Sequence, residues 1–192
     1  MARELENYRV AIVVDNGFEE EELAAPKRAL EAAGARADIV SPVKGKVRGW
    51  RHDHWGHEWP VDRNIATANP ADYDALLLPG GVMNPDKLRR NESVLNFVRP
   101  FVRSGKPIAA ICHGAWTLID ADGVRGRRMT SWPSLQTDLT NAGAKWVDQE
   151  VVVDQGLVTS RSPADLPAFN TRILEEFAES RHATPGTTRA RR

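Results

Sequence analysis

The sequence contains little cysteine and no excess of either charge. Cys112 is the single cysteine among 192 residues, so no disulfide can form within the chain, and a disulfide-stapled secreted scaffold is excluded. Lys and Arg number 26 and are balanced by 26 Asp and Glu residues. A net charge of zero argues against a general nucleic-acid binder, which normally carries a basic excess.

Long hydrophobic runs are also missing. No apolar run approaches the roughly 20 residues that cross a membrane, and residues 1–7 lack the apolar core of a signal peptide. Apolar residues still make up 41% of the chain, which is enough for the core of one domain. We therefore expect a cytoplasmic protein without membrane contact, with one domain over residues 1–181 and a disordered basic tail over residues 182–192.

Short apolar runs alternate with helical patterns along the chain. Apolar runs typical of buried parallel strands lie at residues 8–14, 37–40, 75–78 and 107–111. Helical patterns occupy residues 19–33, 92–103, 114–119, 134–142 and 165–180. Residues 43–65 indicate an irregular hairpin-like excursion, and residues 151–159 a β-hairpin or strand pair. This order predicts a three-layer α/β/α sandwich with a mostly parallel, flavodoxin-like sheet.

Functional groups of such folds collect where the parallel strands end. Cys112 directly follows the fourth predicted strand, and the small residues Ala110, Gly114 and Ala115 surround it. A strand that turns into a helix through one residue with small neighbours is typical of a nucleophile elbow. The amides of the next helical turn are expected to favour a thiolate and to lower the cysteine pKa. The alternative for a lone cysteine is a small buried hydrophobe.

The run AICHG at Cys112, together with LLLPGG earlier in the chain, resembles the PfpI/ThiJ superfamily, a class I glutamine amidotransferase-like group. This group includes PfpI intracellular proteases, bacterial general stress proteins and the parkinsonism-associated deglycase. The resemblance extends over about residues 8–177 and is strongest to the PfpI branch. Further segments that carry it are NGFEEEEL, TSWP, NAGAKWVDQEVVVD and SRSPADL.

The resemblance implies a reactive centre built around Cys112. His113 is implied as its dyad partner, and the backbone amides of His113 and Gly81 as an oxyanion hole. Glu22 matches the glutamate that contacts the reactive cysteine in the superfamily, where it would be protonated and donate a hydrogen bond. Glu19, one turn earlier, is the alternative. Without the resemblance, these acids would simply complement a helix N-terminus.

Two residues depart from the family pattern. PfpI proteins place a glutamate near Asp86 that completes a Cys-His-acid triad across a subunit interface. This chain has the shorter Asp and one extra residue before it, so an N-cap or surface role for Asp86 is the alternative. Archaeal PfpI members have a tyrosine at Trp132. Tryptophan has no phenol hydroxyl, and we expect it to form an apolar wall of the pocket.

Three histidines, His52, His54 and His57, lie within the excursion at residues 43–65. Such a cluster could bind zinc, but no strong fourth ligand is evident, so we expect no metal. Family members carry a hairpin here, often with aromatic residues, so the resemblance implies a subunit contact or a pocket wall instead. Gly80 and Gly81 do not form a phosphate-binding glycine motif, and we expect no cofactor.

These features favour a stress-response protein that is a cysteine-dependent hydrolase of deglycase, glyoxalase-like or peptidase type. Its partners would be a small carbonyl compound, a glycated protein or a peptide, and a second copy of the chain in a dimer or hexamer. Glutamine amidotransferase activity is not expected, because His182 is the only histidine after His113. The alternatives are a non-enzymatic oxidative-stress sensor or chaperone-like protein acting through oxidation of Cys112, and a flavodoxin-type binding module.

Overall fold

The structure, a computed structural model, describes residues 4–182. The predicted tail lies outside the described residues except for His182, which is the last residue of helix α6 (Leu166–His182) and so extends that helix beyond its predicted end. A search of the described residues for a helix long and apolar enough to cross a membrane finds none.

A seven-stranded sheet forms the middle layer, in the order β11-β12-β8-β7-β1-β3-β6. These strands are β1 (Arg9–Val13), β3 (Arg36–Ser41), β6 (Arg63–Asn64), β7 (Ala75–Leu78), β8 (Ile108–Ile111), β11 (Val151–Asp154) and β12 (Leu157–Ser160). All neighbouring strands are parallel except β11 and β12, which form the predicted hairpin. The five strands β3-β1-β7-β8-β12 have the flavodoxin-like order, as predicted.

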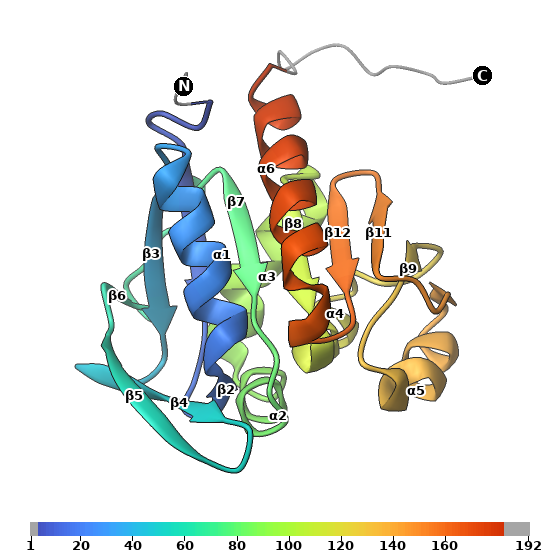
Figure 1. Ribbon diagram of the computed structural model, residues 1–192, viewed down its shortest axis with the longest axis horizontal. Coiled ribbons are helices and arrows are strands. Elements are labelled where there is room, and N and C mark those ends of the chain that lie inside the picture. Colours follow the sequence, from blue (N-terminus) through green and yellow to red (C-terminus); the bar gives the residue numbers. More distant parts are fainter. Residues whose placement is uncertain (1–3, 183–192) are drawn as a thin grey trace.

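Helices cover both faces of this sheet. They are α1 (Glu20–Ala32), α2 (Met83–Leu88), α3 (Glu92–Ser104), α4 (Ala115–Asp120), α5 (Gln136–Asn141) and α6, with short 3₁₀ helices η1 (Pro70–Asp72), η2 (Cys112–Gly114), η3 (Pro133–Leu135) and η4 (Pro163–Asp165). Helices α1 and α6 lie in front of the sheet in Figure 1, and α3 and α4 lie behind it. The predicted three-layer sandwich is therefore confirmed.

The two faces of the sheet bury separate cores because successive side chains of a strand point to opposite sides. Ala11 and Val13 of β1 pack with the apolar stripe of α3. Val10 and Ile12 point the other way and pack with α1 and α6. With every strand residue from Val10 to Val13 buried, β1 is a rigid support for the loop that follows it.

Two smaller sheets flank the sandwich. Strand β2 (Phe18–Glu19) pairs with β4 (Lys46–Arg51), which forms an antiparallel hairpin with β5 (His54–Pro60). This hairpin is the predicted excursion, and it lies below the carboxyl ends of the parallel strands in Figure 1. A second pair joins β9 (Arg128–Met129) to β10 (Lys145–Trp146). The β4–β5 hairpin therefore stands next to the end of the sheet where the reactive cysteine was predicted.

Candidate active site

A cleft of about 410 Å³ lies at the carboxyl ends of β1, β7 and β8. Its lining residues are Gly17, Glu19, Glu22, Trp50, His52, Gly81, Val82, Met83, Cys112, His113, Trp132 and Pro163. The loops after these three strands all contribute to it, which agrees with the expectation from strand order.

Cys112 stands at a sharp turn between β8 and η2, at the base of the cleft. Its backbone has a φ of 59°, in the left-handed region that non-glycine residues rarely adopt. The turn is possible because Gly114 packs tightly behind it: a Cβ atom on Gly114 would lie 2.2 Å from the Leu78 carbonyl oxygen. The side chain therefore projects from a constrained elbow, and only 7% of Cys112 is exposed.

Two backbone amides converge on the Cys112 sulfur. The N–H groups of Gly81 and His113 both lie close enough to act on it, and both favour its thiolate form. Gly81 has a φ of +72°, and a Cβ atom there would lie 2.5 Å from the Gly17 carbonyl oxygen. Only glycine fits such a close approach of two backbone segments. The amides expected to form an oxyanion hole thus lie together near the Cys112 sulfur.

His113 points its ring along the wall of the cleft. Its Nδ1 atom lies 3.2 Å from Cys112 Sγ, and its Nε2 atom 3.4 Å from Ser134 Oγ. Burial lowers the pKa of His113, because desolvation disfavours the charged imidazolium. A neutral ring has one nitrogen free to accept a proton, and Nδ1 is positioned to accept it from the thiol. The contact with Ser134 has no counterpart in the sequence interpretation.

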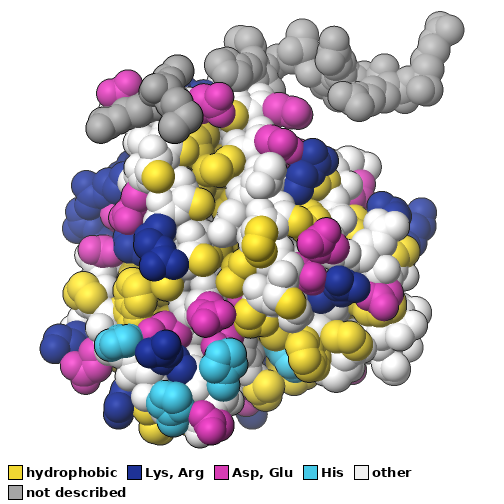
Figure 2. All heavy atoms as spheres, in the orientation of Figure 1, with side chains coloured by type: hydrophobic (Ala, Val, Ile, Leu, Met, Phe, Trp, Pro, Cys, Tyr) yellow, Lys and Arg dark blue, Asp and Glu magenta, His cyan; other side chains and the backbone are white. Residues whose placement is uncertain are grey.

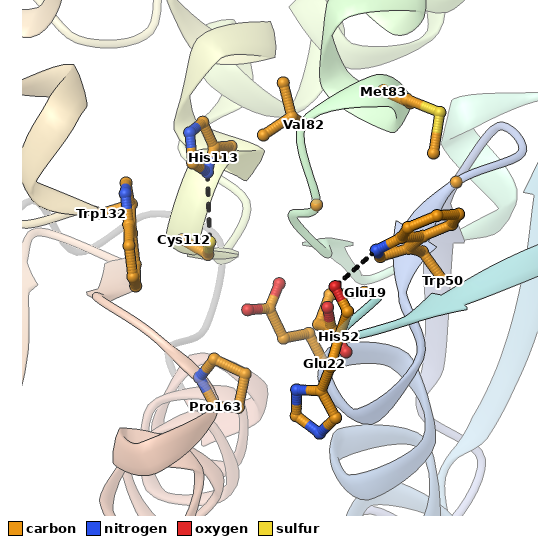
Figure 3. Close-up of a pocket in the computed structure, with 12 residues that line it drawn as sticks. Glu19, Glu22, Trp50, His52, Val82, Met83, Cys112, His113, Trp132 and Pro163 are labelled. Carbon is orange, nitrogen blue, oxygen red and sulfur yellow. Dashed lines mark hydrogen bonds between the residues drawn. The ribbon is translucent and has the colours of Figure 1, made fainter. Parts of the chain in front are cut away.

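Trp132 lies against His113. The two rings stack with an interplanar angle of 24° and a centroid distance of 6.1 Å, and Figure 3 shows Trp132 on the side of the cleft opposite Trp50. Trp132 is 41% exposed and forms a wall of the cleft, in the position expected from the sequence.

The Glu22 carboxyl is completely buried beside Cys112. One of its oxygens accepts the backbone N–H of Gly80 at 2.7 Å, and a Cβ atom added to Gly80 would lie 2.6 Å from that oxygen and 2.7 Å from Cys112 Cβ. Burial raises the pKa of Glu22 to about 8, so the group keeps its proton at neutral pH. Between the two candidate acids, the structure places Glu22 next to the cysteine.

The expected low pKa of Cys112 is wrong for this arrangement. Burial raises the pKa of the thiol, and the nearby Glu22 raises it further, although the amides of His113 and Gly81 act in the opposite direction. Desolvation of a thiolate outweighs two hydrogen bonds because the sulfur is almost cut off from water. The resting site therefore holds a protonated thiol beside a neutral imidazole.

Acidic residues at the start of α1 face different parts of the molecule. Glu19 lines the cleft, and burial raises its pKa. Glu20 instead holds the β4–β5 hairpin: its carboxyl accepts the His57 backbone N–H at 2.6 Å and bonds the His57 ring Nδ1 at 2.7 Å. These contacts fix the hairpin whose Trp50 and His52 complete the cleft. The β4–β5 hairpin thus supplies a pocket wall, one of the two roles expected for the excursion at residues 43–65.

The three histidines of the hairpin do not converge on one point. They gather on the surface at the lower end of the view in Figure 2, over this hairpin. His57 binds Glu20, His54 bonds Asp53 at 2.7 Å, and His52 lines the cleft. Within residues 4–182, no group of three or more His, Cys, Asp or Glu side chains is arranged to hold a metal ion.

Asp86 lies away from the cleft. It is exposed in the first turn of α2, and Val82 rather than Asp86 occupies the N-cap position. The N-cap alternative for Asp86 is therefore wrong, because the helix starts earlier than the Asp, whereas a surface position is observed. Residues that the sequence interpretation missed are Met83, Val82 and Pro163, which follow β7 and β12. The strand-end rule that selected Cys112 also applies to them.

Comparison with known proteins places these features in one family. The DJ-1/PfpI family pattern matches residues 8–176. Protein/nucleic acid deglycase 2 of Escherichia coli (strain K12) is 44% identical over 86% of this chain and 95% of its own, and general stress protein 18 of Bacillus subtilis (strain 168) is 42% identical over 86% and 95%. A solved two-domain protein from Anabaena variabilis, with DJ-1/ThiJ/PfpI-like and ferritin-like domains, superimposes with a TM-score of 0.84 at 33% identity, covering 96% of this chain and 52% of that one. The chain belongs to the DJ-1/PfpI family.

Proposed function

We propose that this protein is a cysteine-dependent hydrolase of the deglycase type, acting on carbonyl groups through Cys112. The observation that carries the proposal is the contact of 3.2 Å between Cys112 Sγ and His113 Nδ1, at a point where two backbone amides also converge. Acyl-type chemistry requires a nucleophile, a base and oxyanion donors that can all reach the same carbonyl group. The names of two relatives, a deglycase and a general stress protein, support a stress-related role.

The chemistry starts from the neutral pair. As the carbonyl carbon approaches, His113 Nδ1 takes the thiol proton, and the sulfur forms a bond to that carbon. The carbonyl electron pair moves onto oxygen, where the N–H groups of Gly81 and His113 stabilise the negative charge. The adduct collapses when the leaving group takes the proton back from His113, and water then releases the remaining group from sulfur. Glu22, still protonated, keeps a second negative charge away from the sulfur.

A second candidate function is oxidation sensing through Cys112. One observation favours it: the Glu22 Oε1 atom is buried and has no hydrogen-bond partner within residues 4–182. A protonated carboxyl in that position can donate to an oxygen added to the sulfur, so a sulfinate would be stabilised there. In this alternative the protein would respond to peroxide without turning over a carbonyl substrate.

We also propose that the protein works in the cytoplasm as a homo-oligomer, without a nucleic-acid or membrane partner. Large apolar side chains that a partner copy would cover include Trp55, at 42% exposure, and Val82, at 56%. Light scattering of the purified protein tests this: a monomeric mass would contradict it.

One experiment separates the hydrolase from the sensor. Purified protein is assayed for methylglyoxal consumption, for release of glycated amino groups and for peptide cleavage, with Cys112→Ala as the matched variant. Turnover that disappears in the variant supports the hydrolase and identifies its substrate class. No turnover by the wild type, together with quantitative oxidation of Cys112 by mild peroxide in a mass spectrum, would reject the hydrolase in favour of the sensor.

A further inference from the structure

The cleft at Cys112 is lined by carboxyl groups and by no fixed positive group. Among the described residues that line it are two carboxyls, Glu19 and Glu22, and neither Lys nor Arg. The Oε1 atoms of both carboxyls are buried and find no hydrogen-bond partner in the described part of the chain. An anion entering this cleft would meet carboxyl oxygens without any compensating charge.

Glu19 is the carboxyl of this pair that can interact with a bound compound. Glu22 faces the sulfur and keeps its proton, whereas Glu19 is only partly buried and stands in the wall of the cleft. Its neighbour His52 also lines the cleft and lowers the pKa of Glu19, against the effect of burial. The Glu19 carboxylate would attract a cation placed in the cleft and would repel a carboxylate.

Two indole rings add to this preference. Trp50 and Trp132 border the cleft from opposite sides (Figure 3). The Trp50 ring is fixed, because its Nε1–H donates to the His52 carbonyl oxygen at 2.8 Å. Neither indole carries a charge, so neither offers a bound anion a positive partner.

We propose that Glu19 sets the charge preference of this cleft, so that carbonyl compounds bearing a neutral or cationic group reach Cys112 and those bearing a carboxylate or sulfonate are disfavoured. This inference rests on the proposed function, since it names which carbonyl compounds the hydrolase accepts. It assigns to Glu19 a role in specificity, separate from the contact of Glu22 with the sulfur. A carbonyl group attached next to a guanidinium or ammonium group fits the charge of this acid.

Thiol labelling tests the charge preference without requiring turnover. Cys112 is treated with 2-(trimethylammonio)ethyl methanethiosulfonate or 2-sulfonatoethyl methanethiosulfonate at pH 7.5 and low salt. In each reaction the thiolate sulfur attacks the reagent, a mixed disulfide forms and methanesulfinate leaves. Because both reagents react with the same thiolate, the ratio of the two rate constants does not depend on the fraction of ionised Cys112. Dividing by the same ratio for 2-mercaptoethanol removes the intrinsic difference between the reagents.

In the wild type we expect this normalised cation-to-anion ratio to be about tenfold above that of the free thiol. Glu19→Gln should lower it at least about threefold. Glu19→Asp, which retains the charge, should keep most of it. Glu21→Gln is the matched control, because it removes the same charge from an exposed position of α1 outside the cleft, and it should leave the ratio near the wild-type value.

Three outcomes would overturn the inference: a wild-type ratio equal to that of the free thiol, equal ratios in Glu19→Gln and Glu21→Gln, or a Cys112 that none of the reagents labels. The first two leave the proposed hydrolase intact, because they concern only which compounds enter. Conversely, failure of the turnover assay with a high labelling ratio would reject the hydrolase and retain the charge preference. Circular dichroism of Glu19→Gln establishes that the variant is folded before its ratio is interpreted.

Discussion

Glu22 accepts the Gly80 backbone N–H at 2.7 Å through one carboxyl oxygen, and both residues press against Cys112. A Cβ atom on Gly80 would lie 2.6 Å from Glu22 Oε2 and 2.7 Å from Cys112 Cβ, so the three groups leave no space for another atom. The buried carboxyl is thus held in a gap that water cannot enter. The protonation state of Glu22 must therefore differ between the folded and the unfolded protein, and the pH dependence of stability measures this difference.

The first prediction concerns stability and pH. The pKa of Glu22 rises from its usual 4.5 to about 8 in the folded protein, so the native state keeps a proton that the unfolded state loses. Stability from this group is complete below pH 4.5 and declines as the pH rises to about 8, by at most about 5 kcal/mol. Glu22→Gln, which cannot ionise, should flatten this decline in urea unfolding at pH 5, 6.5 and 8.

Glu21→Gln serves as the control, because Glu21 is exposed on the same helix and should keep the wild-type slope. Part of the slope will remain in Glu22→Gln, since the pKa of Glu19 is also raised by burial. An unchanged slope in Glu22→Gln would mean that this carboxyl is ionised in the folded protein at neutral pH.

The second prediction concerns the reactivity of the thiol. Burial raises the pKa of Cys112, so the native protein holds little thiolate at neutral pH. The rate of alkylation by iodoacetamide should keep increasing above pH 9, where a free thiol with a pKa of about 8.5 already approaches its plateau. The same chain unfolded in guanidinium chloride is the reference. A plateau below pH 8 in the native protein would contradict a raised thiol pKa.

The third prediction concerns the elbow. Gly114→Ala would place a Cβ atom 2.2 Å from the Leu78 carbonyl oxygen, a backbone atom of a buried strand that cannot move aside. We expect a loss of about 3 kcal/mol in unfolding free energy and a loss of Cys112-dependent activity. Gly126→Ala is the comparison: Gly126 has a φ of +76° with nothing within 4 Å, so only backbone strain of about 1 kcal/mol is expected. Equal costs at both positions would show that the turn at Gly114 is free to relax.

The fourth prediction concerns the hairpin. Glu20→Ala removes the carboxyl that bonds the His57 amide and ring, and should destabilise the protein by about 2 kcal/mol. Amide hydrogen exchange should increase across β4 and β5, while β1 and β7 stay protected. Glu21→Ala, at an exposed position, should stay within about 0.5 kcal/mol of the wild type. Unchanged exchange in the hairpin would mean that another contact holds it.

Much of the fold could be predicted from the sequence because its strands are short, β-branched and continuous. The run at residues 8–14 is apolar on both faces, as a strand with helices on each side must be. Helix α2 was missed because six residues with Pro85 inside show no helical period. The parallel pair of β9 and β10 was missed because each strand has two residues and exists only through tertiary contacts.

A site residue could be predicted from the sequence when its place at a strand end determines its role. A property that depends on the folded environment, such as a pKa, could not. Cys112 directly follows a strand end, and a local pattern is enough to select it, whereas the role of Gly81 was implied by the resemblance to the family. The pKa of the thiol depends on how much water reaches the sulfur, which no neighbouring residue in the sequence indicates. The contact of His113 with Ser134 joins the 3₁₀ helices η2 and η3, 21 positions apart, and becomes visible only after the chain has folded.

Residues 19–22 are four consecutive glutamates, but each of them has a different role in the structure. Glu19 ends strand β2, and Glu20, Glu21 and Glu22 form the first turn of α1, in which each residue rotates by about 100°. The four carboxyls therefore face the cleft, the hairpin, the solvent and the sulfur in turn. Deleting any one of them would hardly change the composition. It would, however, rotate the residues that follow by about 100°, so that the apolar side of α1 would no longer face the sheet. A random library over this segment should therefore recover one freely variable position and three restricted ones, in an order that composition cannot reveal.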